Sequence, residues 1–415
     1  MANQRIVADL HLHSRYSMAT SRALDLTTLS GAAERKGVQL LSAADFTHPE
    51  WRCEIGEKLV DDGSGLFQLK VAHPDAPRFV LGTEVSCVWR DPPITGRGRR
   101  VHLLLFAPDF AAVDALISRF EPHGALASDG RPLLKLSVHD VADLVMDADE
   151  RCEIIPAHVW TPWYGVYGSK SGFDSLEEAF GEHAGRIHAI ETGLSSDPEM
   201  NWALPELANR ALVSFSDAHS AANVGREVTE FEMEPTYDGL MAAIATQSIA
   251  ETIEFFPENG KYHLDGHRSC GIRLTPSESA ELDGKCPTCG KSLTLGVLNR
   301  IESLSGEAQT SQANSDGLVR SSGNRPPFRR LVPLRDLVAA VEGVGNNTKI
   351  VGRAVDMLIE HCGSELFVLI NATSRELQNA ATDEIAAAII SVRQGDLEIE
   401  PGYDGIYGVV STITD

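Results

Sequence analysis

Short apolar runs alternate with amphipathic stretches from residue 5 to about residue 250, and this alternation limits the possible folds more than any other feature. The runs have the length of strands buried in a parallel sheet, and the stretches have helical spacing. Repeated strand–helix units predict an α/β fold, and over about 250 residues they favour a closed barrel. An open doubly wound sheet is the alternative, but no glycine-rich dinucleotide or phosphate loop supports it. Strands are expected at 38–42, 78–81, 101–106, 153–156, 187–190 and 212–215, and helices at 26–36, 110–119, 138–146, 176–183 and 201–210.

Histidine and acidic residues stand at or just beyond the expected carboxyl ends of these strands. His11 and His13 follow an apolar run, and residues two apart in a strand point to the same side, so both imidazoles are expected to project together. Paired imidazoles suit a shared metal ion, and barrel enzymes build active sites at this end. Histidine and carboxylate ligands without cysteine favour Zn²⁺, Mn²⁺ or Fe²⁺, and so many ligands imply more than one ion. The series is His11, His13, Asp45, His48, Glu84, His102, His158, Glu191, Asp217 and His219, with Glu84 and Asp217 as bridging candidates.

A second pattern combines His267 and Cys270 with Cys286 and Cys289. Two knuckles at this separation predict a closed tetrahedral zinc site with three cysteines and one histidine. Its zinc is expected to be structural, because a segment of about 40 residues cannot bury enough core by itself. The other cysteines have no such partners and are expected to be ordinary thiols.

The composition of the chain changes near residue 256, where glycine, proline and cysteine become frequent and the hydrophobic periodicity is lost. We expect a barrel over 1–255, a zinc-binding module over 256–305, a flexible linker over 306–330 and a mainly helical domain over 331–415. Residues 318–335 carry no acidic side chain, and their arginines suit either a DNA duplex contact or a solvated linker end. These arginines are Arg320, Arg325, Arg329, Arg330 and Arg335.

Net charge and hydrophobicity argue against some classes of protein. The 415 residues carry 36 Lys and Arg against 59 Asp and Glu, a formal net charge of −23. This charge argues against non-specific polyanion binding by the whole surface, although a local basic groove remains open. No apolar run approaches the roughly 18 residues needed to span a bilayer, so a cytoplasmic protein is expected. The C-terminus shows no strong sliding-clamp-binding sequence.

The ordered motifs DLHLHS, ADFTH, GTE, VHLLLF, PAHVW and SDAH resemble the polymerase and histidinol phosphatase (PHP) family. The resemblance implies a distorted (β/α)₇ barrel that holds up to three ions and hydrolyses phosphoesters, with Glu84, Asp217 and His219 at the catalytic centre. It implies one ion held by His11, His13, Glu84 and Asp217, a second by Glu84, His102 and His158, and a third by His219 with Asp45 or His48. One departure affects the third ion: Phe46 and Thr47 separate Asp45 from His48, which are usually adjacent.

Beyond the metal motifs, the whole chain resembles the endonuclease Q family. This resemblance rests on four short motifs and on the tryptophan- and tyrosine-rich segment 160–175. The motifs are DFTHPEW, GKYHLDGH, PPFRRLVPL and GYDGIYG. It implies a DNA-repair endonuclease that nicks the strand 5′ to deaminated bases (uracil, hypoxanthine, xanthine) or abasic sites. It also implies Zn²⁺ in the barrel, with Mn²⁺ or Mg²⁺ for part of the set, and damaged DNA as the partner. The alternatives are a phosphatase for a small phosphomonoester and a non-catalytic DNA-binding module.

Residues 160–171 combine aromatic, hydroxyl and cationic side chains directly after His158. Aromatic faces stack on extruded bases, while serine and lysine hold phosphates, so this loop is expected to contact DNA. A lid that simply packs over the site is the alternative. The expected DNA contacts are Trp160, Trp163, Tyr164, Tyr167, Ser169, Lys170 and Ser171, with Arg329 and Arg330 from the basic stretch.

Overall fold

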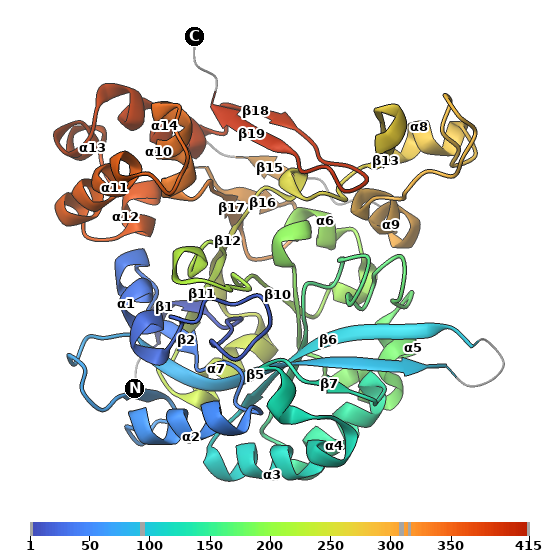
Figure 1. Ribbon diagram of the computed structural model, residues 1–415, viewed down its shortest axis with the longest axis vertical. Helices are drawn as coiled ribbons and strands as arrows, with labels where there is room; N and C mark the ends of the chain where they lie inside the picture. The colour runs from blue at the N-terminus through green and yellow to red at the C-terminus, as the bar shows by residue number, and fades with distance from the viewer. Residues whose placement is uncertain (1–2, 92–95, 307–310, 314–316, 413–415) are drawn as a thin grey trace.

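A computed structural model describes residues 3–91, 96–306, 311–313 and 317–412. Strands with surrounding helices fill the lower part of the view in Figure 1, and the C-terminal helices and the cysteine-rich segment lie above them on opposite sides. The mixed α/β class predicted from the sequence is confirmed.

Seven strands follow one another around a closed circuit, in which each strand lies beside the next along the chain. β1 (Gln4–Asp9) pairs in parallel with β2 (Leu40–Ser42), and β2 pairs in parallel with β5 (Arg78–Arg90). β6 (Gly98–Ala107) is antiparallel to both β5 and β8 (Glu153–Pro156), and β9 (Ala189–Glu191) is parallel to β10 (Ala211–Val213). β2, β8, β9 and β10 are buried at every position, as expected of apolar runs covered on both faces.

One or two isolated backbone hydrogen bonds, rather than continuous ladders, join the remaining neighbours of this circuit. The Val159 N–H donates to the Glu191 carbonyl at 3.1 Å, linking the end of β8 to β9. Beyond β10 and β1, the His13 N–H donates to the Ala218 carbonyl at 3.2 Å. The antiparallel β6 and these weak joints make the ring irregular, and they bring the ends of β1, β8, β9 and β10 together.

Seven helices flank the strands, and polar caps begin most of them. Four side chains each accept the backbone N–H of the third residue of the following helix, which satisfies an otherwise unpaired donor. They belong to Asp25, Asp109, Ser137 and Ser175. The helices are α1 (Leu26–Lys36), α2 (Pro49–Lys58), α3 (Phe110–Phe120), α4 (Val138–Ala148), α5 (Leu176–Phe180), α6 (Pro198–Trp202) and α7 (Tyr237–Thr246).

Two expected helices are shorter than the sequence pattern predicted. The helix expected over 176–183 ends at Phe180, because Gly181 takes a positive φ of 56° that terminates it. The helix expected over 201–210 is wrong: α6 ends at Trp202 and only a 3₁₀ turn follows at Pro205–Leu207. Pro205 disfavours helical geometry at the residue before it, so the chain breaks there.

The predicted flexible linker at 306–330 contains strands in its described part. β17 (Phe328–Arg330) pairs in parallel with β12 (Ile249–Glu254), and β12 is antiparallel to β11 (Val228–Met233), which borders β1. Phe328 is fully buried with its ring 5.6 Å from that of Trp202, and this anchor explains why the segment is ordered. β15 (Ser311–Ala313) and β16 (Val319–Ser321) extend the same sheet. At the opposite end of this sheet, β4 (Phe67–Leu69) pairs with β5 and β3 (Leu59–Asp61) pairs with β4, while β7 (Leu133–Leu134) also pairs with β5.

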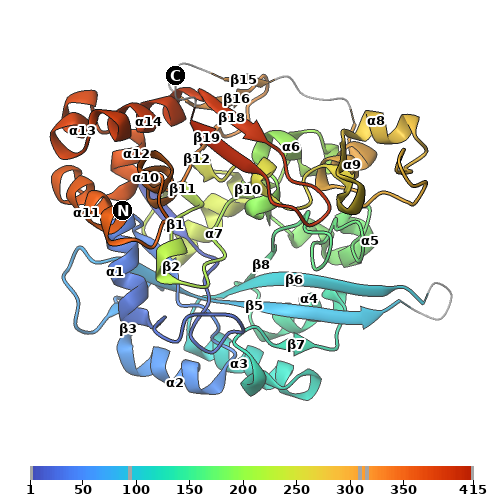
Figure 2. The ribbon, with the colours of Figure 1, turned by 45° about the horizontal axis from the view of Figure 1, so that its top comes forward.

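The C-terminal part contains five helices and a hairpin, and Figure 2 shows the helices beside α1. The buried Lys36 Nζ donates to Glu365 Oε1 at 2.8 Å, which ties α1 to α12. In the described residues no helix combines the length and the apolar character needed to cross a membrane. The cysteine-rich segment and the helix after it contain β13 (Asp265–His267), β14 (Ile272–Leu274), α8 (Pro276–Glu281) and α9 (Val297–Leu304). The elements of the C-terminal part are α10 (Leu334–Glu342), α11 (Lys349–Cys362), α12 (Glu365–Ile370), α13 (Ser374–Ala380), α14 (Asp383–Gln394), β18 (Leu397–Glu400) and β19 (Val409–Thr412).

Candidate metal centre

Six of the predicted ligand residues meet at the carboxyl ends of β1, β8 and β10 and in the middle of β5 and β6. They form two groups in which one ligand atom from each residue lies within 4.8 Å of the others. Glu84 of β5 belongs to both groups. The first group is His11, His13, Glu84 and Asp217, and the second is Glu84, His102 and His158.

Glu84 turns one carboxylate oxygen toward each group. Its Oε2 lies 3.4 Å from His11 Nε2 and 3.3 Å from His13 Nε2, while its Oε1 lies 2.6 Å from His102 Nδ1 and 3.3 Å from His158 Nε2. Ligands about 2.0–2.1 Å from a shared tetrahedral Zn²⁺ lie about 3.3 Å from one another. The measured separations fit two neighbouring ions joined by one carboxylate.

Besides Glu84, Asp217 also places a carboxylate oxygen close to the imidazoles of His11 and His13. Its Oδ1 lies 3.0 Å from His13 Nε2 and 3.4 Å from His11 Nε2. Asp217 takes a positive φ of 46° at the turn after β10, and the next residue, Ala218, pairs with the chain beyond β1. The joint that closes the ring of strands therefore also places this carboxylate.

One ring nitrogen of His11 tests whether these residues fit an ion. Nε2 is buried and has no hydrogen-bond partner, although buried polar atoms are normally paired. The opposite nitrogen, Nδ1, lies 2.9 Å from Glu191 Oε1, and Glu191 Oε2 accepts the His158 backbone N–H at 2.7 Å. A carboxylate behind a histidine fixes which nitrogen faces the metal. Glu191 therefore orients His11 toward an ion, and the site fits one.

The charges at the centre favour a bound cation. Burial by itself lowers the pKa of His11, but the carboxylates of Glu191, Asp217 and Glu84 raise it well above the usual value. Burial by itself raises the pKa of Glu84, but His102, Arg131 and His11 hold it well below the usual range. Without a metal, protons and one arginine balance the buried carboxylates, and divalent ions would replace those protons.

The three residues implied for a third ion are not gathered into one ligand group among the described residues. Asp45 Oδ1 lies 3.3 Å from His13 Nδ1, and its Oδ2 accepts the Ser14 N–H at 2.6 Å. His48 directly precedes α2, and its ring stacks on that of Tyr16 at 4.2 Å, while the His219 ring lies 4.4 Å from the His13 ring. Asp45 thus lies behind His13 in the way that Glu191 lies behind His11.

Arg131 is a residue of the centre that sequence reasoning missed. Its Nη1 donates to Glu84 Oε2 at 3.1 Å, and the side chain is largely buried. Gly130 allows this approach, because a Cβ there would lie 2.3 Å from both Asp45 Oδ2 and Ser17 Oγ. A single arginine in an irregular loop gives no periodic or spacing signal that could have identified it.

The loop after His158 separates into buried and exposed residues. Trp160, Tyr167 and Ser171 are at most 1% exposed, and Trp160 Nε1 donates to Asn201 Oδ1 at 2.8 Å. The expectation that these three contact DNA is wrong, because their side chains pack into the barrel wall. Trp163 is 51% exposed and Lys170 is also exposed.

The exposed Trp163 lies beside a cation and close to the metal centre. The Arg100 guanidinium carbon lies 5.4 Å from the Trp163 ring and 5.8 Å from the Tyr164 ring. The Tyr164 ring lies 4.3 Å from the His102 ring. Ser169, later in the same loop, is half-buried. The loop therefore carries exposed aromatic and cationic groups at the edge of the second ligand group.

The two arginines predicted to contact DNA are engaged within the protein. Arg329 Nη2 lies 2.8 Å from Glu251 Oε2, and Arg330 Nη2 lies 2.5 Å from Asp197 Oδ2. Both pairs connect β17 to the barrel. These arginines hold the strand in place rather than forming a free basic surface.

A cavity of about 190 Å³ opens directly beside the metal centre. It lies where the barrel, the start of the zinc-binding module and the C-terminal tail meet. Its walls combine aromatic, apolar and polar groups, as ligand-binding pockets commonly do. The lining includes His158, Asp217, Pro162, Lys261, Tyr262 and Tyr407.

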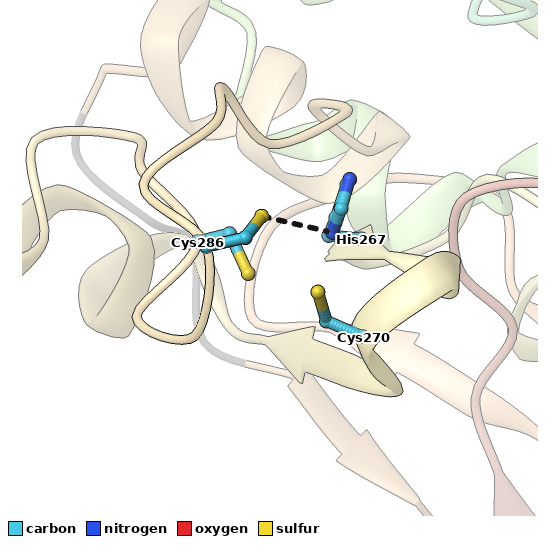
Figure 3. A group of neighbouring side chains, drawn as sticks. His267, Cys270 and Cys286 are labelled. Carbon is cyan, nitrogen blue, oxygen red and sulfur yellow. Dashed lines mark hydrogen bonds between the residues drawn. The ribbon is translucent and has the colours of Figure 1, made fainter.

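The predicted zinc knuckle is gathered in one place. His267, Cys270, Cys286 and Cys289 form a ligand group, with Cys289 Sγ 3.7 Å from His267 Nδ1. Figure 3 shows the labelled side chains pointing toward one another from the β13–β14 hairpin and the facing loop. Burial raises the pKa of the Cys286 thiol, but the Cys289 and Thr288 backbone N–H groups bring it down to about 7. This favours the thiolate that zinc requires.

Comparison with known proteins extends over the whole chain. Residues 333–396 match the family model described as the MJ0043 C-terminal domain. Protein MJ0043 of Methanocaldococcus jannaschii is 33% identical over 260 residues, and the match spans 61% of this chain but only 31% of that protein. YqxK of Bacillus subtilis is 28% identical over 434 residues, with 98% and 99% of the two chains covered.

Two solved structures share the architecture. The lesion-specific endonuclease PfuEndoQ of Pyrococcus furiosus matches with a TM-score of 0.84 and 29% identity, over 99% of this chain and 96% of that one. An endonuclease Q bound to a 27-mer duplex with an abasic lesion at its active site matches with a TM-score of 0.83 and 29% identity, over 99% and 97%. With the predicted motifs in place and both chains matched almost end to end, this chain belongs to the endonuclease Q family.

Proposed function

We propose that the protein is a metal-dependent DNA-repair endonuclease that nicks the strand 5′ to deaminated bases (uracil, hypoxanthine or xanthine) or abasic sites. The observation that carries the proposal is the position of Glu84, whose two oxygens face two adjoining ligand groups. Its relatives support the DNA substrate, because one of them is described as lesion-specific and another was solved with a damaged duplex.

The residues of the centre suit phosphodiester hydrolysis. Ions in the two groups, Zn²⁺ or in part Mn²⁺ or Mg²⁺, would lower the pKa of a bound water and neutralise the leaving oxygen. Glu84 and Asp217 would hold these ions between the strand ends. Glu191 would keep His11 in the orientation that presents Nε2, and Arg131 would add a positive charge beside the phosphate.

Recognition of the lesion is assigned to the cavity beside the centre and to the loop next to it. A base rotated out of the duplex could enter between Tyr262, Tyr407 and Pro162, close to His158 and Asp217. Trp163 would stack on a neighbouring base, while Ser169 and Lys170 would contact phosphates. The cavity is lined by polar and aromatic groups together, which permits reading of the edge as well as the face of a base.

The test uses end-labelled duplexes that carry uracil, hypoxanthine, xanthine, an abasic site or no lesion. We expect a nick 5′ to the lesion, loss of nicking after chelation and recovery when Zn²⁺, Mn²⁺ or Mg²⁺ is restored. Asp217→Asn should be inactive, whereas Asp75→Asn, which changes an exposed carboxylate elsewhere, should behave like the wild type. Release of phosphate from small monoesters without nicking of any duplex would contradict the proposal and favour a phosphatase.

A further inference from the structure

A third cluster of imidazole and carboxylate groups lies outside the barrel centre and the knuckle. His139 and Asp143 come from α4, where a spacing of four places them on one helix face. His183 comes from the 3₁₀ turn at 181–186 that packs against α4. We propose that these three side chains form a separate transition-metal site, with Zn²⁺ as its ion.

The distances in this cluster match those of ligands around one ion. Asp143 Oδ1 lies 2.7 Å from His183 Nε2, and Asp143 Oδ2 lies 3.4 Å from His139 Nδ1. The two imidazole rings are 5.0 Å apart, and one ligand atom from each residue lies within 4.8 Å of the others. Ligands of a tetrahedral zinc lie about 3.3 Å apart. The 3.4 Å contact has this separation, whereas the 2.7 Å contact is a hydrogen bond that would lengthen when an ion replaces its proton.

A fourth residue orients the cluster from behind. Glu182 Oε2 lies 3.1 Å from His139 Nε2, so the nitrogen opposite the shared carboxylate is engaged by a second carboxylate. This repeats the arrangement of Glu191 and His11 in the barrel. Gly181 makes room for it: its φ is +56°, and a Cβ there would lie 3.2 Å from His139 Cδ2.

Ligand chemistry indicates which ion fits. Two imidazoles and one carboxylate favour Zn²⁺, Ni²⁺ or Cu²⁺ over Mg²⁺ or Ca²⁺, which prefer oxygen ligands. Asp143 is about half exposed and the His183 side chain is 17% exposed, so water can complete the coordination. A purely hydrogen-bonded network would also pair these groups, and only metal binding distinguishes the two.

An ion at this position would fasten the turn at 181–186 to α4. The turn leads directly into β9, which ends at Glu191 of the barrel centre. The turn does not depend on the ion to stay in place, because Arg186 Nη2 donates to the Glu150 carbonyl of the chain after α4 at 2.7 Å. Variants of the cluster should therefore fold, and the ion should act as an added staple.

The test is calorimetric titration of Zn²⁺ into protein whose barrel and knuckle have first been loaded and freed of excess metal by gel filtration. We expect one further binding event and a higher melting temperature in the wild type, and neither in His183→Ala or Asp143→Asn. Glu182→Gln should bind about tenfold more weakly, as for other partners behind a metal-bound histidine.

His73→Ala is the matched control, since it removes an exposed histidine that lies beside one carboxylate, Asp75, at 3.4 Å. It should retain the further event. Equal Zn²⁺ binding and equal thermal gain in wild type, His183→Ala and Asp143→Asn would overturn the proposal. DNA cleavage is not the readout, so this result is independent of the proposed nuclease function.

Discussion

The barrel centre and the zinc knuckle gather histidines with other ligands in opposite ways. The barrel ligands come from five strands between residues 11 and 217, are mostly buried and are held by carboxylates such as Glu191 and Asp45. The knuckle ligands lie within residues 267–289, on a short hairpin and a loop with little core around them. We therefore expect the fold to position the ligands in the barrel, whereas metal binding should stabilise the local structure of the knuckle. Loss of metal should therefore abolish chemistry in the first and structure in the second.

Glu84→Gln should produce the largest loss of activity. The change removes the charge that both ligand groups share, and we expect cleavage to fall by more than the roughly 100–1000-fold seen when one group that stabilises a developing charge is lost. The melting temperature should change little, because glutamine has nearly the same volume and shape as glutamate and fills the same buried position in β5. Single-turnover cleavage and a thermal melt of the same sample check this. A strongly unfolded variant would contradict the claim that the fold holds this site.

Cys286→Ser should show the reverse pattern. Zinc binding to such knuckles contributes about 10–16 kcal/mol in isolated peptides, so its loss should unfold the module near 257–296. We expect one zinc fewer per chain, rapid proteolysis of this segment and weaker DNA binding, with the barrel ions retained. Cys53→Ser, which changes an exposed thiol outside the knuckle, is the control. Undiminished zinc content would refute the three-cysteine, one-histidine site.

Glu191→Gln should have an intermediate effect on the barrel. The amide can still contact His11, but it no longer favours the tautomer that presents Nε2 to an ion. We expect about 10–100-fold weaker metal binding, with activity partly restored by excess metal. Metal titration of cleavage measures this. A fall in activity that no metal concentration corrects would show that Glu191 does not act by positioning a ligand.

Trp163→Ala should have a smaller and selective effect. Loss of one stacking contact costs about 1–3 kcal/mol per base, so cleavage at deaminated bases should weaken more than cleavage at abasic sites, which have no base to stack. Lys170→Ala should weaken all duplexes alike and reduce the salt dependence. Equal losses on every substrate for Trp163→Ala would favour a simple lid.

Glu254→Gln should alter the pH dependence of barrel stability without touching a ligand. Burial raises the pKa of Glu254 from 4.5 to about 8, despite hydrogen bonds from Thr252, Ser214 and Thr192. Because the folded state holds this proton more tightly, its contribution is complete below about pH 4.5 and is lost as the pH rises through about 8. The variant should gain in melting temperature relative to the wild type between pH 5 and pH 8. A difference that stays constant with pH would contradict the raised pKa.

The sequence was most informative where residue type and strand position agreed. His11, His13 and Asp217 follow buried apolar runs, and the structure brings them together as that position predicted. The four ligands of the knuckle could be predicted equally well, because they lie close together in the sequence.

Features that depend on tertiary contacts gave no such signal. Strands of three residues such as β17 are too short to show periodicity, so a sheet edge was mistaken for a linker. The burial of Trp160 and Tyr167 depends on distant partners, Asn201 and Glu206. Arg131 reaches Glu84 across the fold from an irregular loop, and local sequence carries no trace of that contact.

Anomalous diffraction from crystals grown with Zn²⁺ tests the shared role of Glu84 most directly. Two ions held by one carboxylate should give two peaks about 3.5–4 Å apart, one beside His11 and His13 and the other beside His102 and His158. Both peaks should weaken together in Glu84→Gln, while the knuckle peak remains. A single peak in the barrel of an active enzyme, or two peaks that persist without Glu84, would contradict the bridged centre.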